Sequence, residues 1–276
     1  MMEDFSRVEN DGVEEDPDSP NEAERGIRIL STDSEEASAT LVSVIPVDGD
    51  LTVEGLYNKD SSLVSLRSSS WWGTFGERFS ASWAWEGQTS ALDIYDISVP
   101  EQPELKLQIE MEGGFVTSRR VDKHVYMVAR HTPEIPGLIR YPSTQEEIEE
   151  NKVLLRDLTA AEVLPTVLIN GESSLLVEAD DCLFMDKTNE QASARYGFPV
   201  MTFVIAVDLE SESMLGTSCY MGSVSGVYAS ENAIYLTQAE GYDEESRTLV
   251  HSFEASDDLT YQGSGSVDGH LVSRGE

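Results

Sequence analysis

The chain has 276 residues, with 52 Asp and Glu against 18 Lys and Arg, and a formal net charge of -34. This negative field repels phosphate backbones and anionic lipid, so we expect neither nucleic-acid binding nor attraction to a membrane surface. A hydrophobic content of 39% favours a folded protein over a wholly disordered acidic chain. The sequence contains no run of about 18 apolar residues, so we expect no membrane-spanning segment.

The first 24 residues are polar, acidic and contain proline, which is typical of a disordered tail or a long loop. The start, Met1–Phe5, lacks the basic and apolar regions of a signal peptide, so the chain as written predicts a cytoplasmic protein. From residue 25 to residue 276, short β-type runs separated by turn residues predict one array of strands.

A strand–turn–strand unit recurs three times, at residues 56–64, 118–126 and 227–235. In each copy a long side chain precedes a polar turn, and an apolar strand restarts six positions later (Tyr57 to Leu63, Arg119 to Val125, Tyr228 to Ile234). Such a period must be recognised before any fold is assigned, because repeats define the architecture.

A second recurrence follows the first. Strands at 92–97 and 104–110 flank an acidic turn at Asp96, and strands at 203–208 and 214–220 flank one at Asp208. We expect both aspartates to cap their turns through side-chain to backbone hydrogen bonds. The pairs 27–30 with 40–45 and 248–253 with 259–264 resemble earlier and later copies.

Together the two recurrences predict sheets of four short antiparallel strands in series, as in propeller blades. The predicted fold is therefore all-β, a partial β-propeller of about three to four blades. Incomplete copies at both ends, including a first strand at Gly269–Ser273, predict an unclosed ring. Its exposed strand edges would invite pairing with another chain, although nothing in the sequence supports a ring closed by dimerisation.

Two insertions interrupt the repeat. The first, residues 68–89, contains all four tryptophans: Trp71, Trp72, Trp83 and Trp85. These rings either pack against a neighbouring blade or form a surface on which sugar rings stack.

The second insertion runs from residue 131 to residue 200 and adds roughly 47 residues to one blade. A helix is predicted at Thr144–Leu155, followed by a capping box at Thr159–Glu162. The apolar residues available to pack this segment on the propeller as a structural cap are Ile148, Leu154, Leu155 and Leu158. The alternative is a lid or a partner-docking element.

The two cysteines, Cys182 and Cys219, could close the second insertion with one long-range disulfide if the compartment is oxidising. They form no zinc motif with the scattered histidines, and the sequence has no EF-hand loop, so no metal and no cofactor is predicted. The segment Gly222–Gly226 places its serines wrongly for a nucleophile elbow, so no catalytic residue is predicted.

Several segments resemble bacterial and archaeal secreted proteins that carry a C-terminal β-propeller domain distantly related to WD40 repeats. They are Ser69–Phe79, Ile94–Glu104, Pro136–Pro142, Val227–Tyr235 and Gly265–Leu271. The resemblance implies a propeller fold and an extracytoplasmic location (periplasm, cell surface or medium), and no established activity. Family members look longer than this chain, which therefore looks like a fragment or a short form.

The leading hypothesis is a non-enzymatic propeller that serves an exported protein as an interaction scaffold, with an unknown protein or glycan as partner. One alternative is a propeller hydrolase that acts on glycans or peptides with carboxylates at the channel mouth. Another is a carbohydrate-binding module that uses the tryptophan loop.

Overall fold

The structure is a computed structural model that describes residues 26–47, 51–69, 86–183, 200–222, 224, 226–240 and 247–269. The chain divides into two compact units, Met1–Gly49 and Asp50–Glu276. In the first unit the described residues form one antiparallel hairpin of β1 (Gly26–Asp33) and β2 (Ser38–Pro46). The predicted acidic tail, residues 1–24, lies outside the described residues.

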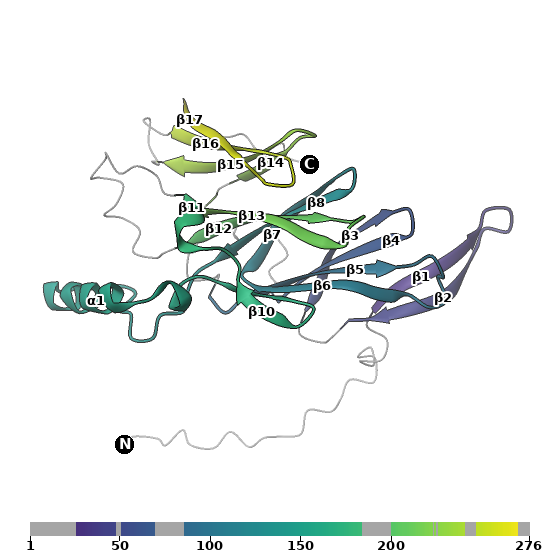
Figure 1. The fold of residues 1–276 in the computed structure, drawn as a ribbon, viewed down its shortest axis with the longest axis horizontal. Coiled ribbons are helices and arrows are strands. Elements are labelled where there is room, and N and C mark those ends of the chain that lie inside the picture. The colour runs from purple at the N-terminus through teal and green to yellow at the C-terminus, as the bar shows by residue number, and fades with distance from the viewer. Residues whose placement is uncertain are drawn as a thin grey trace, which may run out of the picture. The chain divides into compact units, whose positions relative to one another are not determined.

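The described residues of the second unit form three sheets, and the four principal strands of each sheet are antiparallel and follow one another in space in chain order. The first sheet comprises β3 (Thr52–Lys59), β4 (Ser62–Ser68), β5 (Thr89–Asp96) and β6 (Glu104–Glu112). The second comprises β7 (Gly114–Val121), β8 (His124–His131), β12 (Met201–Asp208) and β13 (Ser213–Met221). The third comprises β14 (Gly226–Ala229), β15 (Ala233–Glu240), β16 (Arg247–Glu254) and β17 (Tyr261–Asp268). The predicted all-β fold of four-stranded antiparallel blades is confirmed (Figure 1).

The three sheets share details that mark them as copies of one unit. Each fourth strand carries one extra residue that has no partner on the third strand: Lys106, Leu215 and Gln262. A hydroxyl at the start of each third strand donates to a glycine carbonyl at the end of the fourth, from Ser90 to Gly113, Thr202 to Gly222 and Thr248 to Gly269. β-Bulges increase local twist, so a bulge at one fixed place gives each sheet the same shape.

The β1–β2 hairpin has the features of the third and fourth strands of these four-stranded sheets. Its second strand carries the same single extra residue, Val42. Its turn begins with Asp33, which accepts hydrogen bonds from the backbone amides of Glu35 at 2.8 Å and Glu36 at 3.1 Å. The first unit therefore presents the equivalents of strands three and four of a blade, as the sequence predicted for residues 27–45.

Two apolar cores hold the three sheets face to face. Between the first and second sheets, fully buried residues such as Leu92 and Ile94 pack with Phe203 and Ile205. Between the second and third sheets, Val204 and Ala206 pack with Leu236 and Phe253. Because β12 contributes alternate residues to both cores, the whole strand is buried, as the continuous apolar run predicted.

The second insertion is anchored on two sheets. It contains α1 (Gln145–Asp157), a short 3-10 helix at Ala160–Glu162, β9 (Thr166–Ile169), β10 (Glu172–Leu175), a second 3-10 turn at Ala179–Asp181 and β11 (Cys182–Leu183). β9 pairs antiparallel with β6 and so extends the first sheet, whereas β11 pairs parallel with β13 of the second sheet.

The predicted helix and capping boxes form, but the expected packing of the helix does not. Thr144 caps α1, with the Glu147 amide donating to its hydroxyl at 3.2 Å and the Glu147 carboxylate accepting from the Thr144 amide at 2.9 Å. No residue of α1 is buried: Leu155 is 42% exposed, and Ile148 and Leu154 are only half-buried, as is Leu158 just beyond the helix. The helix therefore adds no residue to a core, and the interpretation of the second insertion as a structural cap stays a prediction.

Candidate functional site

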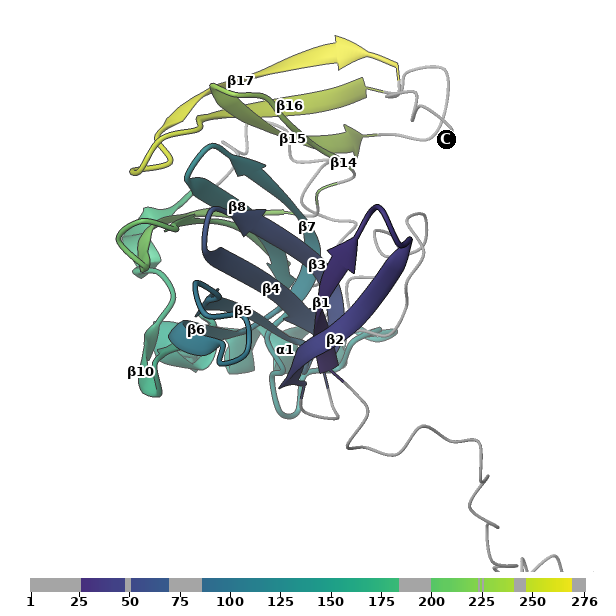
Figure 2. The same ribbon diagram turned by 90° about the vertical axis from the view of Figure 1, so that its right-hand side faces the viewer.

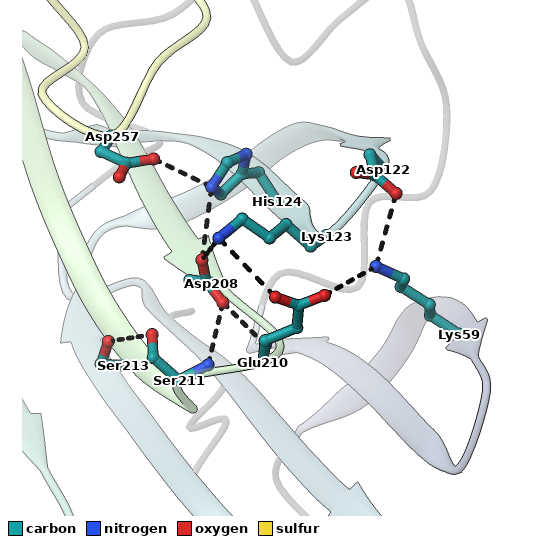
Figure 3. Close-up of polar contacts among 9 residues, drawn as sticks. All are labelled: Lys59, Asp122, Lys123, His124, Asp208, Glu210, Ser211, Ser213 and Asp257. Atoms are coloured by element: carbon teal, nitrogen blue, oxygen red, sulfur yellow. Dashed lines mark hydrogen bonds and ion pairs between the residues drawn. The ribbon is translucent and has the colours of Figure 1, made fainter.

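The largest group of interacting charged side chains among the described residues lies at hairpin turns of the three sheets. We call it the turn cluster; it comprises Lys59, Asp122, Lys123, His124, Asp208, Glu210 and Asp257 (Figure 3). Its members come from the turns β3–β4, β7–β8, β12–β13 and β16–β17. In an antiparallel sheet whose strands follow chain order, the first and third turns lie at the same end, which brings these segments together.

Asp208 is at the centre of the turn cluster. Its Oδ1 accepts hydrogen bonds from the backbone amides of Glu210 at 2.7 Å and Ser211 at 2.9 Å, and its Oδ2 lies 2.7 Å from Nζ of Lys123. Burial disfavours the carboxylate, but the Lys123 and amide hydrogen bonds outweigh that penalty and lower the pKa of Asp208 to about 2. The same contact raises the pKa of Lys123. The pair therefore stays charged at all physiological pH values.

Lysine side chains connect the first sheet to the second. Nζ of Lys59, in the β3–β4 turn, lies 3.4 Å from Asp122 and 3.5 Å from Glu210 (Figure 3). Lys123 adds a longer contact of 3.8 Å to Glu210. A second link between these sheets joins the Tyr57 hydroxyl to the Ser118 hydroxyl at 2.9 Å.

His124 connects the second sheet to the third. Its Nε2 lies 2.9 Å from Oδ1 of Asp257, in the β16–β17 turn, and 3.4 Å from Oδ2 of Asp208. Neither approach has hydrogen-bond geometry, so the attraction is electrostatic and depends on protonation of the ring.

The charged contacts of the turn cluster join turns of the three sheets to one another. A carboxyl group with a pKa of about 2 is too weak a base to accept protons at neutral pH, and the hydroxyls of Ser211 and Ser213 bond to each other at 2.8 Å. Its exposed rim consists of carboxylates, Asp122, Glu210 and Asp257. Within the described ranges, no group of three or more His, Cys, Asp or Glu side chains is arranged to hold a metal ion.

A second polar group is buried within the first sheet. Nε and Nη2 of Arg67 lie 2.8 and 2.7 Å from Oδ2 of Asp93, which is completely buried. Burial raises the pKa of Asp93 despite the neighbouring guanidinium. Breaking this pair would leave an uncompensated charge inside the protein.

The residues predicted from the sequence fall in three places. Trp71, Trp72, Trp83 and Trp85 lie outside the described residues, so neither hypothesis for the tryptophan loop is tested. Cys182 and Cys219 form a disulfide with an S–S distance of 2.07 Å, which attaches β11 of the second insertion to β13. Asp96 and Asp208 both cap their turns as expected, Asp96 by accepting from the Ser98 amide at 2.8 Å.

The turn cluster itself was not predicted. Its members are separated by up to about two hundred positions, and no spacing rule connects them. One signal was present: four of the six residues in Arg119–His124 are basic, which is unusual in a chain of net charge -34. Two of these four, Lys123 and His124, contact carboxylates of other turns in the structure.

Four-stranded antiparallel sheets in series, packed face to face with their turns gathered at one end, define a β-propeller type of architecture. The sequence model of the Beta propeller domain family matches residues 9–274. The chain therefore belongs to the β-propeller domain family. No curated protein matches the chain significantly. In the part of the chain that the structure describes, no helix is long and apolar enough to cross a membrane.

Proposed function

We propose that this propeller is a non-enzymatic interaction scaffold of an exported protein, and that the second insertion is its docking element. The observation that carries the proposal is the contrast between the two parts of the insertion. Its base is fixed to two sheets, whereas α1 contains no buried residue. A rigidly mounted but uncovered element is typical of a binding site displayed by a scaffold.

The base of the insertion is held by backbone pairing and by a covalent bond. Ile169 to Val167 of β9 pair with Ile109 to Met111 of β6, and the Asn170 side chain accepts from the Gln108 amide at 2.9 Å. On the second sheet, the Cys182–Cys219 disulfide fixes β11. Buried Val167 and Leu176 join the core between the two sheets. These contacts fix the position of the segment from which α1 extends.

The surface of α1 combines exposed apolar groups with negative charge. Val153 is 56% exposed and Leu155 is 42% exposed. Glu146, Glu149 and Glu150 are exposed on the same helix, although Lys152 partly neutralises Glu149 at 2.8 Å. This composition suits a protein partner that offers a small apolar patch bordered by Lys or Arg side chains.

The disulfide supports export. Structural disulfides persist in oxidising compartments and are rare in the reducing cytoplasm. Cys219 is completely buried and Cys182 nearly so, which suits a structural role better than a catalytic or redox-sensing one. The resemblance to secreted propeller proteins points in the same direction.

The test places a photoreactive amino acid at Val153 of the full-length protein in the cells that produce it. A scaffold that docks through α1 should crosslink to one or a few defined proteins. The double substitution Val153→Ser and Leu155→Ser should reduce recovery of those partners at least tenfold in affinity capture. The matched control is Val99→Ser, an equally exposed apolar residue in the β5–β6 turn.

Two outcomes would contradict the proposal. Equal recovery of partners by the α1 variant and the Val99 control would show that α1 is not the docking element. Hydrolysis of a glycan or peptide by the purified protein, abolished by a single Asp or Glu substitution, would replace the scaffold by an enzyme.

A further inference from the structure

A small hollow remains where the third sheet packs on the second (Figure 2). Both sheets belong to the same compact unit, and the hollow lies between β7 and β8 of the second sheet and β14 and β15 of the third. We call it the junction hollow, and it has room for about one group of the size of water or methyl. Its apolar wall is formed by Val128, Val227, Ala229 and Ile234. Arg119 lines the junction hollow too and is exposed, so this side chain is at its mouth.

The corresponding place between the first and second sheets is closed. Tyr57 of the first sheet corresponds to Arg119, since both precede the restarted strand of the repeat by six positions. The Tyr57 ring packs against the core between those sheets, and its hydroxyl lies 2.9 Å from the hydroxyl of Ser118 on β7. An aromatic ring and a hydrogen bond therefore fill the place at which the next junction has a hollow.

At the junction of the second and third sheets, the sequence does not allow this closure. Val227 takes the place of Ser118 in the repeat, and a valine side chain has no group that can form a hydrogen bond. Nη1 of Arg119 donates instead to the carbonyl of its own neighbour, Ser118, at 2.8 Å. Among the residues that the structure describes, Arg119 forms no ion pair with a carboxylate. A guanidinium has five N–H donors, so most of them remain available at the mouth of the junction hollow.

The junction hollow and Arg119 favour two different chemical groups. The apolar wall favours a small aliphatic group, because the burial of apolar surface lowers the free energy of binding. The guanidinium of Arg119 favours a carboxylate, which can accept two parallel hydrogen bonds from an arginine side chain. The last residue of a polypeptide that ends in alanine or valine carries both groups on one carbon atom, the free carboxylate and a small aliphatic side chain.

We propose that the junction hollow and Arg119 bind the free C-terminus of a partner polypeptide that ends in alanine or valine. The terminal carboxylate accepts hydrogen bonds from the Arg119 guanidinium, and the last side chain enters the junction hollow. Capture of a C-terminal carboxylate is a recurrent mode of peptide recognition. The site goes beyond the proposed docking through α1, because it uses neither α1 nor the second insertion.

The charge of the chain restricts the segment that precedes this C-terminus. A net charge of -34 repels an acidic segment, so the partner must be neutral or basic there. The carboxylate of Asp257 lies close to the junction hollow: burial raises the pKa of Tyr126, which lines the hollow, and the charge of Asp257 raises it further. Asp257 is exposed and can pair with a basic side chain. We therefore expect Lys or Arg shortly before the last residue of the partner.

The experiment measures fluorescence anisotropy of a labelled hexapeptide that contains two lysines and ends in valine, titrated with the full chain. The peptide is used with a free C-terminal carboxylate and with a C-terminal amide. The free carboxylate should bind at least about tenfold more tightly, because only it pairs with Arg119. General attraction to the acidic surface would instead favour the amide, which carries one more unit of positive charge. An amide that binds as tightly as the free carboxylate, or more tightly, would overturn the proposal.

The substitution Arg119→Gln assigns the difference to this site. It should weaken binding of the free carboxylate at least about tenfold and leave binding of the amide unchanged. Arg247→Gln is the matched control, since Arg247 is exposed on the third sheet and does not line the junction hollow; it should bind as wild type does. Equal binding by Arg119→Gln and wild type would overturn the proposal.

A change in the peptide tests the junction hollow without altering the protein. A hexapeptide that ends in tryptophan keeps the carboxylate, but its ring is too large for a hollow of methyl size. It should bind at least about tenfold more weakly than the peptide that ends in valine. Equal affinity for the two peptides, or no binding of the valine peptide to wild type at concentrations up to about 1 mM, would contradict the proposal.

Discussion

At the scale of single residues, an aspartate that recurs in the hairpin and in the first two sheets is used in two ways. Asp33, Asp96 and Asp208 occupy equivalent turns, and each accepts hydrogen bonds from backbone amides two or three positions ahead. Only Asp208 is buried, and it also binds Lys123. The repeat therefore separates the turn-capping role, which all three share, from the junction role, which only Asp208 has.

The substitution Asp208→Asn keeps a turn acceptor but removes the charge that binds Lys123. We expect a loss of about 1–2 kcal/mol in the free energy of unfolding at pH 7, because hydrogen bonds to charged groups are stronger than neutral ones. The matched control, Asp96→Asn, should lower the free energy of unfolding much less. Urea denaturation of both variants measures the difference, and equal losses would contradict the junction role.

The pH dependence of this contribution follows from the lowered pKa of Asp208, about 2 in the folded protein. Its stabilisation is fully present above the unfolded-state pKa of about 3.9 and is lost as pH falls from there toward 2. The difference in unfolding free energy between wild type and Asp208→Asn should shrink over that interval. If the difference in unfolding free energy between wild type and Asp208→Asn stays constant down to pH 2, the charge of Asp208 is not the source of the stabilisation.

The buried Arg67–Asp93 pair gives a second residue-scale prediction. Arg67→Met should destabilise the protein by about 3–5 kcal/mol, because it leaves the Asp93 carboxyl buried without its cation. The double variant Arg67→Met, Asp93→Leu should recover most of that loss. Chemical denaturation of the single and double variants tests the coupling, and additive losses would show that the two side chains are not energetically paired.

At the scale of elements, the second insertion depends on its two anchors. β9 adds to the edge of the first sheet, and β11 is joined to the second sheet by Cys182–Cys219. The disulfide closes a loop with a sequence separation of 37 residues that includes the end of the insertion and all of β12. Without the disulfide, β11 would be attached to β13 through the pairing of two residues.

Replacing both cysteines by serine should lower the free energy of unfolding by about 2–4 kcal/mol. Hydrogen exchange should rise most in residues 176–183, next to the lost bond, while β4 and β5 stay protected. Thr144→Ala is the comparison, since it removes only the cap of the uncovered helix and should raise exchange in α1 alone. Equal protection of residues 176–183 in the double serine variant and wild type would show that the disulfide is not an anchor.

The elements also show what the sequence could predict. The repeat placed every principal strand and the turn roles of Asp96 and Asp208, since alternation and turn chemistry are local properties. It missed β9 and β10, which have four residues each; β9 has its partner in β6, more than fifty positions earlier, and β10 pairs with β9. The exposure of Leu155 was also missed, because an apolar face on a helix does not reveal what lies beneath it. The turn cluster requires four distant turns to converge, which only the three-dimensional packing shows.

At the scale of the whole molecule, the interface between the second and third sheets contains a pH-sensitive group. His251 is buried beside the Tyr220 ring, with centroids 4.3 Å apart, and its Nδ1 lies 3.3 Å from the Tyr261 hydroxyl. Burial lowers the pKa of His251. His131, at the end of β8, has its pKa lowered by burial as well. Both rings are therefore neutral in the folded protein at neutral pH.

Acid should weaken this interface. A histidine whose pKa is lowered by folding gives full stability above the unfolded-state pKa of about 6.5, and that stability is lost as pH falls through the lowered value. The melting temperature should decrease between pH 7 and pH 5, and less so in His251→Gln. A melting temperature that is independent of pH across this range, or a His251→Gln variant as sensitive as wild type, would contradict the assignment.

The proposed function makes the chain a scaffold of an exported protein, with its second insertion fixed by the Cys182–Cys219 disulfide. Its most direct test is to alkylate free thiols in the cells that produce the protein, then map its peptides without reduction. An exported scaffold should give a linked peptide pair containing Cys182 and Cys219 and no alkylated cysteine. Full alkylation of both cysteines in protein from intact cells would place the chain in a reducing compartment and contradict the claim.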